Sequence, residues 1–118
     1  MLDADEARAF AQDRIESWNA HDMERILSHY EDGFEMTCPV IISTMDEPSG
    51  TLRNKAAIAA YWGRVLERYR ELHFELLHLL HRAGSVTIIY NGVRGLSAEV
   101  FHFSPSGKVQ TVRAQYMP

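Results

Sequence analysis

Three stretches in the first part of the chain place apolar residues three or four positions apart, which is the spacing of an amphipathic helix. The first covers residues 3–19 and opens with Asp3, in a sequence that resembles a capping box. The second covers residues 23–30 and follows Asp22, a residue type that caps helices. The third follows Asn54 and has the strongest periodicity, carried by Ile58, Tyr61, Trp62, Val65, Leu66 and Tyr69. This pattern predicts three helices.

From His73 onward the hydrophobic period changes to that of strands. The strand-like segments are residues 73–84, 85–92, 96–103 and 108–116. Short turns containing glycine separate them, and such connections predict antiparallel pairing. Residues 34–37 add a short extended piece before Cys38-Pro39, because the residue before a proline is pushed out of the helical region. Helices followed by strands indicate an α+β fold, in which three N-terminal helices pack on a strongly curved antiparallel sheet.

Residues 43–53 are rich in Ser, Thr, Pro and Gly, and we expect them to form the one long loop of the chain. A loop of this length is either functional, as a lid or gate, or a solvated connection. The chain has 118 residues and no internal repeat or low-complexity segment. We therefore expect a single domain over residues 1–118 with one core.

Glu99 lies in a strand whose other positions of the same parity are largely apolar. If Ser104–Gly107 is a four-residue hairpin loop, Glu99 pairs with Val112, and side chains alternate between the two faces of the sheet. One face then carries Ser97, Glu99, Phe101, Phe103, Val112, Ala114 and Tyr116. A carboxylate on such a face is costly, unless burial raises its pKa and leaves it neutral or a cation pairs with it.

Arg14 is the second misplaced charge, because it lies in the middle of the apolar stripe of the first helix, four residues from both Phe10 and Trp18. Either its stem packs on that face while its guanidinium reaches water, or the guanidinium pairs with Glu99. Such a pair either satisfies itself as a structural clamp or holds a carboxylate ready for proton transfer or hydrogen bonding to a ligand. Both interpretations stay open.

The composition excludes several function classes. A net charge of −4 offers no basic face for nucleic acid, and apolar runs such as residues 40–42 are too short to cross a membrane. The single cysteine, Cys38, cannot form an internal disulfide, and residues 1–10 lack the apolar run of a signal peptide. We therefore expect a cytoplasmic protein. The chain has no glycine-rich phosphate loop and no nucleophile elbow, so we expect no cofactor.

Six histidines raise the question of a metal site. His73, His78 and His81 share one strand, but His78 faces opposite to the other two, and no spacing resembles that of zinc ligands. We therefore expect no metal. His78 shares the parity of Phe74, so it either enters the pocket or lies in the core as a satisfied histidine.

The order of elements and several short motifs resemble the nuclear transport factor 2-like superfamily over essentially the whole chain. The motifs are W-N-A-H-D at 18–22, Tyr30 at the end of the second helix, A-I-A-A-Y-W at 57–62 and G-K-V-Q-T at 107–111. Within the superfamily, the chain is most similar to SnoaL-like polyketide cyclases and bacterial ketosteroid isomerases. The resemblance implies a cone that holds a small apolar molecule, and a homodimer formed through the outer face of the sheet.

By the resemblance to the isomerases, Glu99 matches a protonated acid that donates a hydrogen bond to an oxyanion. Arg14 matches the catalytic tyrosine of those enzymes, and Cys38 matches their carboxylate base, which is therefore lost. Tyr30 and Trp62 match supporting tyrosines. The candidate ligand-binding residues are Trp18, Tyr30, Met36, Cys38, Tyr61, Trp62, His78, Phe101, Val112 and Tyr116.

SnoaL-like cyclases use a single acid/base carboxylate to move a proton next to a carbonyl in a hydrophobic polycyclic substrate, and one Glu99 is compatible with that chemistry. Limonene-type epoxide hydrolases use an Asp–Arg–Asp set, which this chain fits poorly because only one acid and one arginine are visible. The hypothesis is an acid–base isomerase or cyclase in which Glu99 moves or donates the proton and Arg14 sets its charge or binds the oxyanion. The alternatives are a non-catalytic ligand-binding protein and a dimeric accessory subunit with a filled cone.

Overall fold

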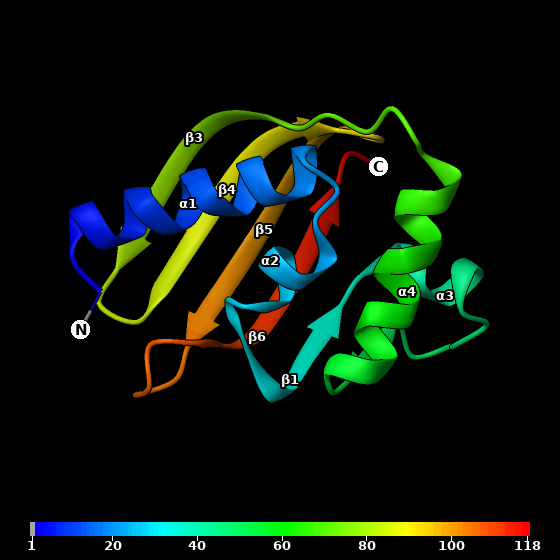
Figure 1. The fold of residues 1–118 in the computed structure, drawn as a ribbon, viewed down its shortest axis with the longest axis horizontal. Coiled ribbons are helices and arrows are strands. Elements are labelled where there is room, and N and C mark those ends of the chain that lie inside the picture. The colour runs from blue at the N-terminus through cyan, green and yellow to red at the C-terminus, as the bar shows by residue number, and fades with distance from the viewer. Residues whose placement is uncertain (1) are drawn as a thin grey trace.

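The computed structural model describes residues 2–118, which form helices packed on a six-stranded sheet (Figure 1). The helices are α1 (Ala4–Asn19), α2 (Met23–Leu27), α3 (Pro39–Thr44) and α4 (Lys55–Arg68). The strands are β1 (Tyr30–Thr37), β2 (Thr51–Arg53), β3 (Glu75–Arg82), β4 (Ser85–Gly92), β5 (Gly95–Phe103) and β6 (Val109–Tyr116). Within this range no helix combines the length and the apolar character needed to cross a membrane.

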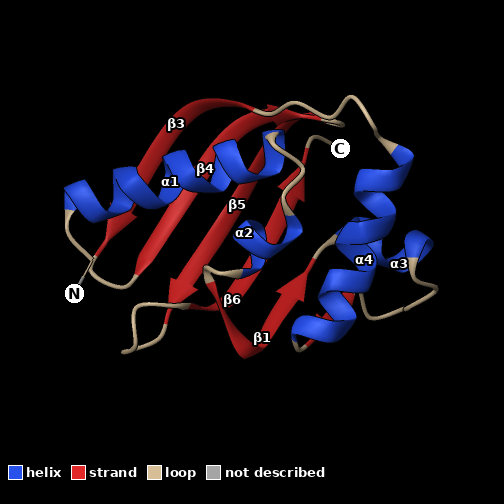
Figure 2. Cartoon of the chain, in the orientation of Figure 1, coloured by secondary structure: helices blue, strands red, loops and turns tan. Residues whose placement is uncertain are grey.

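The strands are ordered β2-β1-β6-β5-β4-β3 in one curved, unclosed sheet (Figure 2). The predicted α+β class, with helices packed on a curved sheet, is confirmed. The described part has four helices instead of three, and β1 runs parallel to β6 while the other neighbours are antiparallel. No hairpin joins β1 to β6, so turn chemistry does not set their relative direction, and a long crossover permits parallel pairing.

The three predicted helix starts are capped as the sequence indicates. The Asp3 side chain accepts a hydrogen bond from the backbone N–H of Glu6, and the Glu6 side chain accepts one from the backbone N–H of Asp3. Asp22 and Asn54 cap α2 and α4 by accepting from backbone N–H groups three residues ahead. These bonds satisfy donors that a helix start otherwise leaves free.

Two segments differ from the expectation. The second helix is shorter than predicted, because Tyr30 pairs with Val109 and opens β1 instead. The long loop expected over residues 43–53 is partly ordered structure. The helix α3 starts at Pro39, a residue favoured at the first helical position, and β2 pairs with the end of β1.

The hairpin between β5 and β6 has a longer turn than predicted. Glu99 lies opposite Ala114, instead of Val112, and a bulge follows between His102 and Phe103. The shift amounts to two residues, and side chains alternate with a period of two, so each side chain stays on the predicted face. The inward positions Ser97, Glu99, Phe101, Val112 and Ala114 are accordingly buried.

A second irregularity changes which face His78 occupies. Leu76 pairs with Tyr90, whereas His78 pairs with Ile89, because the register shifts between Leu76 and His78. The bulge reverses the inward and outward positions of β3. His78 is exposed and does not reach the interior, so the expectation that it enters the pocket or the core is wrong.

Aromatic side chains fill the space between the helices and the start of β1. Tyr30 stacks on Phe34 with ring centroids 4.3 Å apart, and Trp18 meets Trp62 edge-on at 5.4 Å. Phe101 is fully buried beneath them. Because this end of the cone is packed, the hollow lies toward α3, α4 and the turn between β4 and β5.

Candidate functional site

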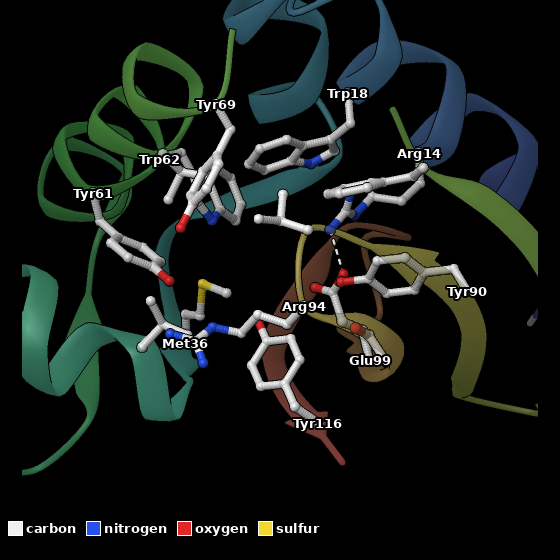
Figure 3. A pocket seen from close by; sticks show the side chains of 15 residues that line it. Arg14, Trp18, Met36, Tyr61, Trp62, Tyr69, Tyr90, Arg94, Glu99 and Tyr116 are labelled. Atoms are coloured by element: carbon white, nitrogen blue, oxygen red, sulfur yellow. Dashed lines mark hydrogen bonds and ion pairs between the residues drawn. The ribbon is translucent and has the colours of Figure 1, made fainter. Parts of the chain in front are cut away.

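A cavity with a free volume of about 70 Å³ lies between α1, α3, α4 and the inner face of the sheet (Figure 3). Most of its lining is aromatic or aliphatic: Trp18, Met36, Val40, Tyr61, Trp62, Val65, Tyr69, Phe74, Tyr90, Val93 and Tyr116. The remaining lining residues are Arg14, Arg94, Ser97 and Glu99. Glu99 is the one carboxylate among the described residues of this wall. The cavity is thus an apolar chamber with a single acidic group.

Arg14 and Glu99 meet at the inner end of the cavity. The helix α1 carries Arg14 on its buried stripe, and β5 carries Glu99 on its inward face. Arg14 Nη2 donates a hydrogen bond to Glu99 Oε1 at 2.5 Å, and each side chain is only 3% exposed. The guanidinium therefore does not reach water, and of the two interpretations of Arg14 the ion pair is confirmed.

Three aromatic rings surround the guanidinium. Arg14 Cζ lies 5.0 Å from the ring centroid of Trp18, 5.7 Å from that of Phe101 and 5.9 Å from that of Phe74. The faces of aromatic rings attract cations, and Trp is the strongest of them. The rings therefore stabilise the buried cation.

The charge state of the site follows from this geometry. Burial, the largest single influence, lowers the pKa of Arg14, but the neighbouring Glu99 carboxylate and two tyrosines together outweigh burial and raise the pKa, so Arg14 stays cationic. Burial, followed by the charge of Glu99, raises the pKa of Tyr90. Tyr90 is therefore a neutral phenol at neutral pH, and Figure 3 shows it directed toward the Glu99 carboxylate.

The ion pair leaves several buried polar atoms without partners. Among residues 2–118, no group hydrogen-bonds to Arg14 Nε, Arg14 Nη1, Glu99 Oε2, Trp18 Nε1 or the Tyr30 hydroxyl. Buried polar groups are nearly always hydrogen-bonded, so such a concentration at one place requires an explanation. Arg14, Trp18 and Glu99 all line the cavity, so most of these unpartnered atoms belong to residues of its wall.

Tyrosine hydroxyls form the opposite wall. Cys38 Sγ lies 3.5 Å from the Tyr61 hydroxyl and 3.4 Å from the Tyr116 hydroxyl. Cys38 is fully buried behind both rings and does not itself line the cavity. Burial first, and then Cys38, raise the pKa values of Tyr61 and Tyr116, so both are neutral hydrogen-bonding groups.

The structure places the predicted site residues in three groups. Those on the cavity wall are Arg14, Trp18, Met36, Tyr61, Trp62, Glu99 and Tyr116. Those buried behind the wall are Tyr30, Cys38, Phe101 and Val112, which do not line the cavity. His78 is outside and exposed. Position alone assigns none of these residues a role in binding or catalysis.

Sequence reasoning missed Tyr90 and Arg94, and it placed Val65 and Tyr69 on the apolar stripe of the third helix without naming them as site residues. A usable signal existed for Tyr90, since it alternates with the buried Val86 and Ile88 along β4 and opposes Ser97. No local pattern marks Arg94, which occupies an exposed turn and contributes to the wall only through its long side chain.

No three His, Cys, Asp or Glu side chains within residues 2–118 gather closely enough to hold a metal ion. The single carboxylate and two arginines of the cavity wall are likewise not a metal-ligand set.

A family model described as a SnoaL-like domain matches residues 11–116. Comparison with curated proteins finds no match. A crystal structure of a SnoaL-like protein of unknown function from Burkholderia thailandensis is 44% identical, with a TM-score of 0.95. That alignment covers 99% of this chain and 98% of the other.

More distant structures share the fold. The epoxide hydrolase/cyclase-like enzyme SalBIII, which acts in pyran ring formation in the polyether salinomycin, is 17% identical with a TM-score of 0.79, over 99% of this chain and 95% of its own. Rv0760c from Mycobacterium tuberculosis, solved in complex with estradiol-17β-hemisuccinate, is 15% identical with a TM-score of 0.74, over 94% of this chain and 93% of its own.

Proposed function

The chain belongs to the SnoaL-like domain family, and on that premise we propose that it binds a small apolar molecule bearing a carbonyl group and moves a proton on it. The observation that carries this proposal is the buried Arg14–Glu99 pair, which makes one direct hydrogen bond and leaves donors and an acceptor unpartnered in two residues that line the cavity. Structural relatives that act in ring formation or bind a steroid derivative support an apolar, cyclic ligand.

The free atoms match the needs of a proton transfer next to a carbonyl. Arg14 Nη1 and Trp18 Nε1 are N–H donors that suit a carbonyl oxygen. Glu99 Oε2 accepts the proton from the neighbouring carbon, while the electron pair moves onto the carbonyl oxygen, where the cation of Arg14 stabilises it. The same carboxyl group returns the proton to another carbon of the enolate, so the net reaction is an isomerisation or part of a ring closure.

The pairing favours the base role of Glu99 over the role of a neutral acid. A 2.5 Å hydrogen bond from a guanidinium favours the ionised carboxylate, and an ionised carboxylate accepts protons. The acid of the steroid isomerases donates a hydrogen bond because its apolar site keeps it neutral. In this protein Arg14, rather than Glu99, supplies the positive end of the site.

The size of the cavity restricts the ligand. A free volume of about 70 Å³ accommodates a few water molecules, whereas pockets for drug-sized ligands span hundreds of Å³. A six-membered cyclic ketone is therefore the sensible probe, and a larger ligand must extend through the mouth of the cavity.

The test uses cyclohex-3-enone, whose isomerisation to the conjugated cyclohex-2-enone is followed by ultraviolet absorbance. We expect Glu99→Gln to lower turnover by about 10²–10⁴-fold, the usual contribution of a positioned general base. Binding is followed separately through the indole N–H signals of Trp18 and Trp62, which are the only two tryptophans of the chain and both line the cavity.

The matched control is Glu75→Gln, which removes the same charge from an exposed position on β3. Turnover that survives Glu99→Gln contradicts the catalytic role. Indole shifts without turnover in the wild type favour the alternative, a non-catalytic binding protein. One observation supports that alternative: the wall formed by the described residues carries a single carboxylate and no histidine.

The proposal includes a homodimer through the outer face of the sheet. That face carries apolar side chains at outward positions, such as Leu80 on β3, Val100 on β5 and Leu96 at the start of β5. Light scattering after gel filtration tests it, since Val100→Glu then yields monomers, whereas Ile42→Glu, on α3, leaves the mass unchanged. A wild-type monomer contradicts the dimer.

A further inference from the structure

A second and wider hollow adjoins the mouth of the cavity. Its volume is about 670 Å³, and it lies between α3, the end of α4 and the turn between β4 and β5. Val40, Val65, Tyr69 and Arg94 line both spaces. These four side chains therefore form the boundary through which a ligand in the inner cavity reaches the outer groove.

The outer groove is strongly basic for so acidic a chain. Arg64, Arg68 and Arg94 line it against one carboxylate, Glu67, although the chain as a whole has a net charge of −4. None of the three arginines makes an ion pair with a carboxylate of residues 2–118.

Neutral partners orient these guanidinium groups. Arg64 Nη1 donates to the carbonyl of Thr44 at 2.9 Å. Arg68 Nε donates to the Tyr69 hydroxyl at 3.3 Å, and its Cζ lies 5.6 Å from the centroid of the same ring. Arg94 Cζ lies 5.8 Å from the ring centroid of Tyr116, and Figure 3 shows its side chain extending across the pocket.

Such contacts position the arginines without neutralising them. A guanidinium carries five N–H donors, so each of the three keeps most of its donors free. Its planar fork matches the oxygens of a carboxylate or a phosphate better than any other side chain does. An anionic group is therefore the chemistry that this groove recognises.

We propose that the ligand is an amphiphilic anion, whose apolar body enters the inner cavity while its carboxylate or phosphate lies in the outer groove against Arg64, Arg68 and Arg94. The inference rests on the proposed function, because the inner cavity is what receives the apolar body. The orientation follows from charge: an anionic group at the inner end meets the Glu99 carboxylate, whereas the same group at the mouth meets three unpaired cations and stays partly hydrated.

The test compares three probes with one apolar body: 4-phenylbutan-1-ol, 4-phenylbutanoate and 4-phenylbutyl phosphate. The indole N–H signals of Trp18 and Trp62 report entry of the phenyl ring, and their titration yields Kd for each probe. We expect both anions to bind at least about tenfold more tightly than the alcohol at low salt, and this advantage to shrink as ionic strength screens the exposed arginines.

Variants separate the groove from the cavity. Arg94→Gln and the double variant Arg64→Gln/Arg68→Gln should each weaken the anions about three- to tenfold. The double variant should leave the Kd of the alcohol unchanged, because neither Arg64 nor Arg68 lines the inner cavity. Arg8→Gln is the control, because it removes the same charge from an exposed position on α1 outside both hollows. The anion whose Kd is lower relative to that of the alcohol identifies the anionic group of the ligand as a carboxylate or a phosphate.

Equal affinity of the alcohol and both anions overturns the inference and leaves the proposed function intact. The inference is also overturned if Arg8→Gln weakens the binding of the anions as much as the groove variants do, since the effect then comes from the net charge of the protein. If none of the three probes shifts the indole signals, the inner cavity does not accept an apolar body, and the proposed function fails together with the inference.

Discussion

Asp13 and Arg14 are neighbours in α1 and belong to two charge clusters of opposite character. Asp13 lies on the outer side of the helix, where its carboxylate accepts hydrogen bonds from Arg25 Nε at 2.8 Å and from His29 Nε2 at 2.5 Å. Arg25 also contacts Glu16. Each member of this surface cluster has a partner, and Asp13 and Arg25 are about one-third exposed.

The interior cluster, Arg14 and Glu99, is buried and only partly hydrogen-bonded. Arg14 and Glu99 are 3% exposed and share one contact, while two nitrogens of Arg14 and one oxygen of Glu99 have no partner within residues 2–118. Taking charges out of water is costly, and a buried pair repays that cost only when its remaining donors and acceptors are satisfied. The surface cluster satisfies its own charges, whereas the interior cluster leaves two donor nitrogens and one acceptor oxygen without a partner among residues 2–118.

The two clusters should differ most in how much the loss of one charged partner lowers the free energy of unfolding. We expect Glu99→Ala to lower it by about 3–5 kcal/mol, because the substitution leaves the Arg14 cation buried and unpaired. Urea denaturation followed by circular dichroism measures the change. The double variant Arg14→Met/Glu99→Leu should recover most of the loss, since a buried ion pair is often replaced by apolar residues without cost. A double variant as unstable as Glu99→Ala would refute this explanation.

The matching change in the surface cluster should have a smaller effect. We expect Asp13→Asn to cost about 1 kcal/mol or less, because Asp13 and Arg25 are partly exposed and water replaces the lost partner. The same denaturation experiment measures it, with Asp5→Asn as the control for an exposed ion pair on the same helix. If Asp13→Asn destabilises as much as Glu99→Ala, the distinction between the two clusters is broken.

The pH dependence of stability has the smallest expected effect and belongs to the surface cluster. Burial lowers the pKa of His29 below its ordinary 6.5; Asp13 acts in the opposite direction, and Arg14 and Lys108 reinforce the lowering. The unfolded chain therefore takes up a proton at His29 more readily than the folded chain does. Stability is fully present above pH 6.5 and falls as the pH drops toward the folded pKa.

Asp13 extends the loss of stability to lower pH. Burial raises its pKa, but the hydrogen bonds from Arg25 and His29 outweigh burial and lower it below the ordinary 3.8. Urea midpoints recorded between pH 8 and pH 5 should fall in the wild type and fall less in His29→Gln. A midpoint that rises between pH 7 and pH 6 would mean that the folded protein binds the proton more tightly than the unfolded chain, the opposite of what the burial of His29 predicts.

Local periodicity was enough to place Arg14 and Glu99 on inward faces, but it left open whether the two side chains pair. Helical spacing places Arg14 on the buried stripe of α1, and strand alternation places Glu99 on the inner face of β5 even though the predicted pairing was two residues out of register. An error of two residues preserves the face of a strand, whereas an error of one reverses it. The bulge in β3 shifts the register by one residue and so reverses the faces, which is why the prediction for His78 failed.

Local patterns place several other wall residues on inward faces, but they do not show which side chains meet. Tyr90 approaches Glu99 through sheet pairing, and Arg94 joins the cavity wall from a turn whose own residues carry no signal. The parallel pairing of β1 with β6 likewise depends on contacts far along the chain. Sequence patterns relate only residues that lie a few positions apart, so they do not predict contacts between distant segments.

Hydrophobic periodicity and capping residues therefore already specify the helices, most strands and the side of each element that turns inward, since backbone geometry converts spacing directly into a face. The unsatisfied atoms of Arg14 and Glu99 and the open mouth beside Arg94 arise only when elements up to 85 residues apart are packed at fixed distances. Which polar atoms find partners depends on differences of about 1 Å between packed elements, and no one-dimensional pattern carries that information.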